Sequence, residues 1–193
     1  MGGPDMAPQF PQRSEAPRRS RGAPRPRLVV ATLNRGKGRE LLRLLAGVPF
    51  TLELLADHPG ATLPDETGAT YRENALLKAR AAAHQTGALA LADDSGLEVD
   101  ALGGAPGIRS ARYGGPGLDD AGRVARLLNA LSAVPDAKRT ARFCAVIAIV
   151  DPSGAEHTVE GVVEGSITRA PRGQGGFGYD PVFFYPPLDG TFG

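Results

Sequence analysis

An almost unbroken apolar segment runs from Arg142 to Val150, and its β-branched residues favour a strand. Such a continuous apolar run is typical of a central strand covered on both faces. Asp151-Pro-Ser-Gly154 then has the composition of a turn, and the segment from Glu156 to Thr168 can return beside the first. The sequence therefore predicts a long β-hairpin at the centre of a sheet.

Other segments alternate between strand and helix patterns. Leu28–Leu33 and Phe50–Leu55 read as short strands, separated by a helix over Arg39–Leu45. An alanine-rich helix is expected from about Thr67 to Thr86, and Gly87 provides its stop. A further helix, capped by Asp119 or Asp120, carries one apolar face formed by Val124, Leu127, Leu128 and Leu131.

The composition bounds the class of protein. With 193 residues, 41% of them hydrophobic, the chain can form one globular domain, which we place at residues 27–193. Residues 1–26 are rich in Pro, Arg, Gly and Ser and are expected to form a disordered tail. The single Cys144 excludes an internal disulfide, and neither a membrane span nor a secretory signal is evident. We therefore expect a cytoplasmic protein without a membrane partner.

The charge distribution argues against a nucleic-acid-binding body. Residues 1–27 hold six arginines against Asp5 and Glu15, a net charge of +4. Because the whole chain carries +1, the remainder carries −3. Such a body lacks the basic footprint of a nucleic-acid interface, so no nucleic-acid partner is expected, although the arginine-rich tail leaves that possibility open.

Two adjacent carboxylates interrupt the apolar segment Leu89–Asp100. Asp93 and Asp94 are predicted at or just past a strand end, followed by Ser95 and Gly96. Neighbouring side chains on a strand point in different directions, and two carboxylates repel unless a cation or proton compensates them. A hard cation such as Mg²⁺, arriving with substrate phosphates, is one interpretation. A solvated turn is the other.

A polar loop between the first strand and the first helix could hold phosphate. Thr32-Leu33-Asn34-Arg35-Gly36-Lys37 offers helix N–H groups, a hydroxyl and a lysine, but not the spacing of a Walker loop. On the next helix, Glu73, Asn74 and Lys78 share one polar edge that could face a cleft. Both segments are equally compatible with ordinary solvated surfaces.

Two glycine-rich segments are further candidates. Arg109 and Arg112, after Gly103–Gly107, could meet phosphates or pair with surface carboxylates. Phe177-Gly178-Tyr179-Asp180 offers aromatic faces to a nucleobase and a carboxylate to its ring N–H groups. Packing of this loop onto the core is the structural alternative.

Read in order, these segments resemble the inosine triphosphate pyrophosphatase family, and the resemblance covers about Leu28 to Phe192. The matching motifs are Thr32-x-Asn34-x-Gly36-Lys37-x-x-Glu40, Tyr71-x-Glu73-Asn74-Ala-x-x-Lys78-Ala, Ala92-Asp93-Asp94-Ser95-Gly96-Leu97, Gly104-Ala-Pro-Gly107-x-x-Ser110-Ala-Arg112-Tyr113 and Gly175-Gly-Phe177-Gly-Tyr179-Asp180-Pro181.

The resemblance implies an α/β fold, with an elongated mixed sheet, flanking helices and two lobes around a central cleft. The implied reaction is Mg²⁺-dependent hydrolysis of non-standard purine nucleoside triphosphates (ITP, dITP, XTP) to the monophosphate and pyrophosphate. It also suggests a homodimer. A non-catalytic nucleotide-binding module on the same fold is the alternative.

The resemblance also assigns roles to residues. Asp94 would be the general base and a metal ligand, with Glu73 and Asp93 as the other metal-associated carboxylates. The triphosphate and the base would be bound by Thr32, Leu33, Asn34, Arg35, Gly36, Lys37, Lys78, Ser95, Phe177, Gly178, Tyr179 and Asp180.

Two residues depart from the family pattern. Leu33 stands where a small residue is usual, and Gly190 stands where a lysine is usual. The family also continues beyond the Thr191-Phe192 region with a helix and a Ser-His-Arg motif. We therefore expect the domain to lack its C-terminal end.

Overall fold

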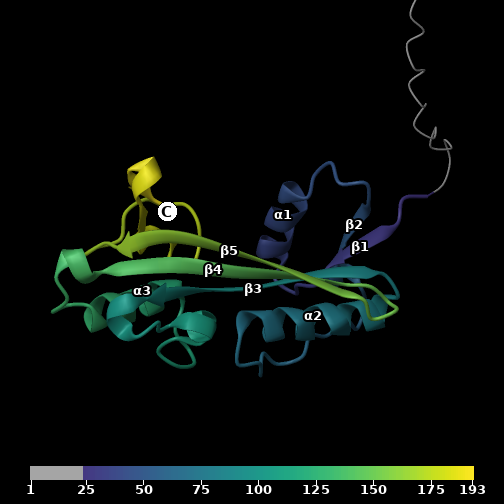
Figure 1. Ribbon diagram of the computed structural model, residues 1–193, viewed down its shortest axis with the longest axis horizontal. Helices are drawn as coiled ribbons and strands as arrows, with labels where there is room; N and C mark the ends of the chain where they lie inside the picture. Colours follow the sequence, from purple (N-terminus) through teal and green to yellow (C-terminus); the bar gives the residue numbers. More distant parts are fainter. Residues whose placement is uncertain (1–23) are drawn as a thin grey trace, which may run out of the picture.

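The computed structural model describes residues 24–193, and its centre is one seven-stranded sheet in the order β2-β1-β3-β4-β5-β6-β7 (Figure 1). Most of the tail predicted for residues 1–26 lies outside the described residues. The strands are β1 (Arg27–Val30), β2 (Thr51–Leu54), β3 (Leu89–Val99), β4 (Thr140–Val150), β5 (Glu156–Ile167), β6 (Phe183–Tyr185) and β7 (Gly190–Thr191). The helices are α1 (Arg35–Leu44), α2 (Tyr71–Thr86) and α3 (Asp120–Ala130).

The sheet is mixed. β1 pairs in parallel with both β2 and β3, whereas every other neighbouring pair is antiparallel. β4 and β5 pair from Thr140–Ser166 to Val150–Glu156, which confirms the predicted hairpin. Its turn is held by the Asp151 carboxylate, which accepts from the amides of Ser153 and Ala155 at 2.8 and 3.0 Å.

The three long strands β3, β4 and β5 join two lobes (Figure 1). At one end α1 and α2 lie on opposite sides of the sheet, and at the other end α3 and the C-terminal segment gather. Each lobe has its own core. The first is alanine-rich, so α2 can approach β3 and β4 closely. The second contains larger side chains, among them Leu97, Leu127, Leu131 and Phe183. The predicted elongated α/β fold is thus confirmed.

The prediction that the Arg142–Val150 strand is covered on both faces is wrong in part. β4 does lie in the middle of the sheet. Val146, Ala148 and Val150 are buried against α2, whereas Ile147 and Ile149 on the other face remain half-exposed. Within residues 24–193 the helix on that side is α1, which contacts β1 and β2, so this face of β4 is only partly covered.

Asp93 and Asp94 do not lie at a strand end, contrary to the sequence prediction. β3 continues through them to Val99, because β4 pairs with it without a break from Ala90–Val150 to Val99–Ala141. This backbone pairing outweighs the turn preference of Asp, Ser and Gly.

Both of the first two helices begin away from their predicted positions. α1 begins at Arg35, earlier than expected, because the Asn34 side chain caps its first amides. α2 begins at Tyr71, later than expected, because Thr70 caps it, and it ends at Gly87 in the left-handed conformation as predicted. Leu44, assigned to the apolar face of the first helix, is 76% exposed. Among the described residues no helix combines the length and the hydrophobicity needed to span a bilayer.

Arg139 stabilises the junction of the second lobe. Its side chain is only 2% exposed, and its guanidinium donates to the carbonyls of Leu131, Ile167 and Thr168 at 2.7 to 2.8 Å. These three acceptors come from the end of α3 and the end of β5, so one buried cation connects both elements.

We expect Arg139→Met to lower the free energy of unfolding by about 2–4 kcal/mol, because it leaves buried carbonyls without donors. Urea denaturation measures this change. Lys138→Met is the matched control, because Lys138 is exposed on the adjacent position and should leave the midpoint nearly unchanged. Equal midpoints for the two variants would contradict the role of Arg139.

Candidate active site

The candidate site lies where β3 loses one of its two neighbours. β1 pairs with β3 only from Leu28–Leu89 to Val30–Leu91, and one further amide, that of Ala31, donates to the Leu91 carbonyl at 2.7 Å. Beyond this point β4 is the only strand beside β3 among residues 24–193, so no described strand covers the other edge of the Ala92–Gly96 segment.

Asp93 and Asp94 point to opposite faces of the sheet at this open edge, as the alternation of a strand requires. The Asp93 carboxylate pairs with Lys37 of α1 at 2.5 Å, and the Asp94 carboxylate pairs with Lys78 of α2 at 2.9 Å. Because α1 and α2 lie on opposite sides of the sheet, each carboxylate has its own lysine (Figure 1). A ligand that crosses the open edge can therefore reach both pairs.

Asp94 is buried and firmly positioned. Besides the Lys78 ammonium, it accepts a hydrogen bond from the Asn74 amide at 3.2 Å, and Asn74 is itself fully buried. Asn74 and Lys78 are one turn apart on α2, so two members of the predicted polar edge of this helix face the acidic strand.

Glu66 is a site residue that the sequence analysis missed. Its carboxylate accepts from Lys78 at 2.9 Å and lies 3.9 Å from the Arg112 guanidinium. Glu66 belongs to the segment between β2 and α2, which has no periodic pattern, so only its Asp65-Glu66 acidity distinguished it.

Lys78 is thus shared by two carboxylates that titrate differently. Burial is the main influence on Asp94, and it raises the pKa of this carboxyl despite the Lys78 charge. Burial also acts on Glu66, but the hydrogen bond and charge of Lys78 outweigh it and lower the pKa of Glu66. Burial opposes the charge on Lys78, yet Asp94 and Glu66 together raise its pKa. Asp94 is therefore the stronger base of the two carboxylates.

The loop before α1 folds onto itself. The Thr32 hydroxyl accepts from the Asn34 amide at 3.2 Å, and the Asn34 side chain accepts from the amides of Gly36 and Lys37 at 2.9 and 3.2 Å. The Asn34 oxygen occupies the position at the helix N-terminus that an anionic oxygen would prefer. A phosphate at this helix N-terminus would have to displace the Asn34 oxygen from these two amides.

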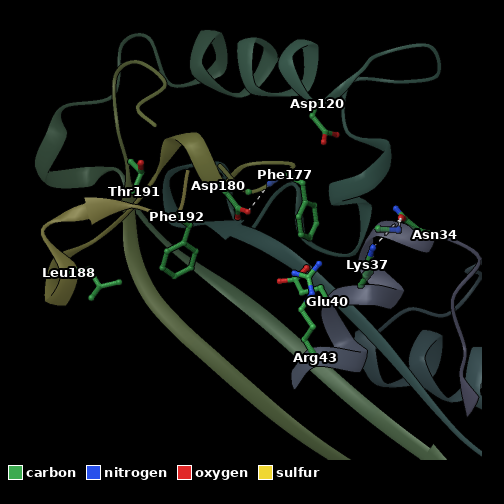
Figure 2. Close-up of a pocket in the computed structure, with 12 residues that line it drawn as sticks. Asn34, Lys37, Glu40, Arg43, Asp120, Phe177, Asp180, Leu188, Thr191 and Phe192 are labelled. Carbon is green, nitrogen blue, oxygen red and sulfur yellow. Dashed lines mark hydrogen bonds between the residues drawn. The ribbon is translucent and has the colours of Figure 1, made fainter. Parts of the chain in front are cut away.

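A cleft between the lobes adjoins this loop (Figure 2). Two adjoining hollows of about 790 and 570 Å³ share Asn34, Lys37, Glu40, Asp120, Phe177, Asp180 and Phe192. Ser95 and Ser110 line the second hollow, and Ser95 lies on the same face of β3 as Asp93. The combined space has the size of a small-molecule site.

The glycine-rich loop Gly175–Pro181 supplies the opposite wall of the cleft. Phe177 is 60% exposed and faces the hollow, whereas Tyr179 is 4% exposed and packs in the second core. The Tyr179 hydroxyl donates to the Ser110 carbonyl at 2.9 Å, and burial raises its pKa to about 12. Of the two aromatics proposed for a nucleobase, only Phe177 is accessible.

Carboxylates order this loop. The Asp180 side chain accepts from the Phe177 amide at 2.9 Å, and Asp120 at the start of α3 accepts from the Gly178 amide at 2.9 Å. Burial raises the pKa of Asp180, and the nearby charges of Glu40 and Asp120 act in the same direction. Asp180 therefore contributes to the loop as well as to the cleft.

Gly96 follows Asp93-Asp94-Ser95 at a place where another loop approaches the strand closely. A Cβ on Gly96 would lie 2.3 Å from the Gly107 carbonyl oxygen, so a larger residue would displace the loop. Ser110 connects this loop to β3, because its hydroxyl accepts from the Leu97 amide at 2.9 Å and donates to the Gly107 carbonyl at 2.7 Å. The same 3₁₀ segment, Gly107–Arg112, carries Arg112 to Glu66.

Three predicted site residues lie apart from these contacts. Glu73 closes the cap of α2, where its carboxylate accepts from the Ala69 amide at 2.6 Å. Arg35 turns toward Asp57, 2.6 Å away, and the Ala56 carbonyl. Leu33 is exposed and is not among the cleft-lining residues. In this structure Glu66, rather than Glu73, accompanies Asp94.

The site has carboxylate oxygens that could serve as ligands of a hard cation. Within residues 24–193 no group of three or more His, Cys, Asp or Glu side chains has metal-binding geometry. Asp94 nevertheless offers carboxylate oxygens at the open edge of β3, and Glu66 lies near the same lysine. Mg²⁺ commonly takes one or two carboxylates and completes its shell with water and substrate phosphates. The residues present therefore fit such an ion only together with a phosphate ligand.

Comparisons with known proteins identify the family of the chain. A family model described as "Ham1 family" matches residues 28–193. A dITP/XTP pyrophosphatase of Desulforamulus reducens is 52% identical over 166 residues, which cover 86% of this chain and 83% of that protein. One of Geobacter sulfurreducens is 53% identical over 158 residues, covering 82% and 79%.

Solved structures show the same fold. A HAM1 protein from Coxiella burnetii is 43% identical, with a TM-score of 0.78 over 86% of this chain and 85% of that one. A nucleoside-triphosphatase, or dITP/XTP pyrophosphatase, from Mycobacterium abscessus is 46% identical, with a TM-score of 0.71 over 86% and 87%. The family resemblance drawn from the sequence motifs is confirmed, and the chain belongs to the Ham1 family.

Proposed function

We propose that this protein hydrolyses non-standard purine nucleoside triphosphates (ITP, dITP and XTP) to the monophosphate and pyrophosphate. The observation that carries the proposal is the buried Asp94 carboxylate, which Lys78 and Asn74 hold at the open edge of β3. The relatives named dITP/XTP pyrophosphatases support the same reaction. A non-catalytic nucleotide-binding module would bind the same substrates without releasing pyrophosphate.

In the proposed complex the triphosphate lies across the open edge of β3. Lys37 and Lys78 neutralise its oxygens from the two faces of the sheet, and Asn34, Gly36 and Lys37 present the helix N-terminus. Without substrate these lysines pair with Asp93 and Asp94. On binding, the two lysines therefore exchange carboxylate oxygens for phosphate oxygens. Their positive charges are already in place before the substrate arrives.

Asp94 acts as the general base. Its oxygen accepts a proton from a water molecule, the water oxygen forms a bond to the α-phosphorus, and the bond to the bridging oxygen breaks so that pyrophosphate leaves. The raised pKa of Asp94 makes it a better proton acceptor than an ordinary aspartate. A bound Mg²⁺ would be held by Asp94 with Glu66 nearby and would supply positive charge opposite the phosphates, whereas Asp93 pairs with Lys37 on the other face of the sheet and Glu73 caps α2.

The base and sugar extend from the phosphate loop into the cleft. The exposed ring of Phe177 offers a flat apolar face, and Asp180 offers a carboxylate beside it. Ser95 lines the hollow between these groups and the acidic strand, in a position to contact the substrate. Thr32, Leu33 and Arg35 support the loop that holds the phosphates.

Assembly and location complete the proposal. We propose a homodimer in the cytoplasm that acts on free nucleotides rather than on nucleic acid. Light scattering behind size-exclusion chromatography would measure the mass, and a value equal to one 20.1 kDa chain would contradict the dimer.

We predict that Asp94→Asn abolishes pyrophosphate release from dITP while the fold persists. The amide keeps the shape of the side chain but cannot take a proton or balance a cation. Because burial opposes ionisation of Asp94, the melting temperature should not fall. Coupled pyrophosphate detection and thermal unfolding measure the two quantities.

Asp136→Asn is the control for this variant, since Asp136 is an exposed carboxylate that pairs with Arg169. It should retain the activity of the parent chain. Turnover by Asp94→Asn within a few-fold of the parent at saturating Mg²⁺ would remove Asp94 from its catalytic role.

We expect Lys37→Ala and Lys78→Ala each to weaken triphosphate binding by about ten- to a hundredfold, because each removes a charge-assisted phosphate contact. Lys78→Ala should also lower kcat, since Asp94 and Glu66 lose their shared cation. Steady-state kinetics with dITP separate these effects. Lys138→Ala is the control, because Lys138 is exposed and does not line the cleft, and it should keep the KM and kcat of the parent. Unchanged KM and kcat in both site variants would refute the assignment of the two lysines.

A further inference from the structure

Arg112 is a cation beside the acidic cluster for which the proposed mechanism has no role. Its guanidinium lies 3.9 Å from one oxygen of the Glu66 carboxylate, beyond hydrogen-bonding distance. The other Glu66 oxygen accepts from Lys78 at 2.9 Å, and Lys78 in turn pairs with Asp94 at 2.9 Å. A single carboxylate therefore separates Arg112 from the ammonium that holds the proposed base.

The loop that carries Arg112 is fixed on the face of the sheet that Asp94 occupies. Gly96 follows Asp94 by two residues on β3 and so shares its face. Gly107 approaches this position so closely that a Cβ on Gly96 would meet its carbonyl oxygen, and the Ser110 hydroxyl accepts from an amide of β3 at 2.9 Å. The backbone beside Arg112 is thus anchored, whereas its side chain is 52% exposed. The guanidinium can therefore turn toward a ligand without moving the loop.

The proposed complex brings the terminal phosphates to this face. Lys37 lies on the α1 side of the sheet, and Lys78 lies on the α2 side (Figure 1). A triphosphate that has its base on the α1 side, and its α-phosphorus attacked beside Asp94, crosses the open edge of β3 at that point. Its β- and γ-phosphates then lie on the α2 side, where Glu66 and Arg112 are.

The charges on this side of the sheet require a further cation. Lys78 carries one positive charge, whereas Asp94 and Glu66 carry two negative charges when both are ionised, so these three groups together repel a polyanion. Arg112 is the one additional cation that pairs with either carboxylate among residues 24–193. Its guanidinium balances the cluster, and the planar arrangement of its donors suits two phosphate oxygens at once.

We propose that Arg112 binds the pyrophosphate half of the substrate, exchanging the Glu66 carboxylate for oxygens of the β- and γ-phosphates. This inference rests on the proposed pyrophosphatase function and adds a residue that acts on the leaving group. When water attacks the α-phosphorus, the electron pair of the broken bond stays on the bridging oxygen of pyrophosphate. Negative charge therefore grows on the half of the substrate that Arg112 contacts, and the guanidinium stabilises it.

The test measures the binding of the two products, pyrophosphate and dIMP, by calorimetry in EDTA. Without metal, the cations of the protein are the only ones that can meet the phosphates. We expect Arg112→Ala to weaken pyrophosphate binding by about ten- to a hundredfold, as for the loss of a charge-assisted contact, and dIMP binding by less than about twofold. An equal loss for both products would show a general disturbance of the site and would contradict the proposal.

Arg80→Ala is the matched control. The Arg80 side chain is also 52% exposed and also pairs with a glutamate, Glu156, at 2.6 Å, but this pair lies outside the acidic cluster. The variant should bind both products as the parent chain does. Unchanged pyrophosphate binding in Arg112→Ala, or an equal loss in Arg80→Ala, would overturn the assignment of Arg112.

Glu66→Gln separates a direct phosphate contact from an effect of Arg112 through Glu66. If Arg112 and Lys78 meet the phosphates directly, removal of the competing carboxylate charge should leave pyrophosphate binding in EDTA unchanged or make it tighter. A loss as large as that of Arg112→Ala would show that Arg112 acts by positioning Glu66, and the proposed contact would be wrong.

The same measurements distinguish this inference from the proposed reaction. A parent chain that binds pyrophosphate through Arg112 but releases none from dITP would refute the hydrolysis and support the role of Arg112. A parent chain that hydrolyses dITP, but either binds no pyrophosphate or binds it equally well after Arg112→Ala, would refute the role of Arg112 and leave the hydrolysis standing.

Discussion

The uninterrupted pairing of β3 with β4 is the constraint on which the rest of the structure depends. It extends β3 well beyond the point where β1 stops, so a segment of β3 is held firmly on one side and open on the other. Because strand residues alternate, this segment presents Asp93 to one face and Asp94 to the other. Two charges that are adjacent in sequence are thereby separated, and each receives a lysine from a different helix.

The electrostatics of the site follow from that separation. Lys37, at the start of α1, pairs with Asp93, whereas Lys78 pairs with both Asp94 and Glu66. Two carboxylates that share one ammonium cannot both be fully compensated, so the more buried Asp94 retains its proton more readily. A buried base of this kind lowers stability, which is a common cost of a functional site.

The two lobes contribute different parts of the cleft because their cores differ. The small side chains of the first core let α2 lie close to the sheet, which brings Asn74 and Lys78 to Asp94. The second core is built from larger side chains and includes Tyr179, so the loop that follows Gly175 is anchored while Phe177 remains exposed. The part of the site around Asp94 is thus formed by short contacts to α2, whereas α1 and the second lobe line a wider hollow.

The sequence alone determined the local patterns. The β4–β5 hairpin, the cap at Gly87 and the polar loop at Asn34–Lys37 depend on neighbouring residues, and the motif order was sufficient to identify the family. Tertiary structure decided the features that depend on distant partners. β4 keeps Asp93 and Asp94 within a strand, the cap of α2 engages Glu73, and the packing of the second core buries Tyr179. Glu66 carries no local signal, because its contact arises only where the chain brings it beside Lys78.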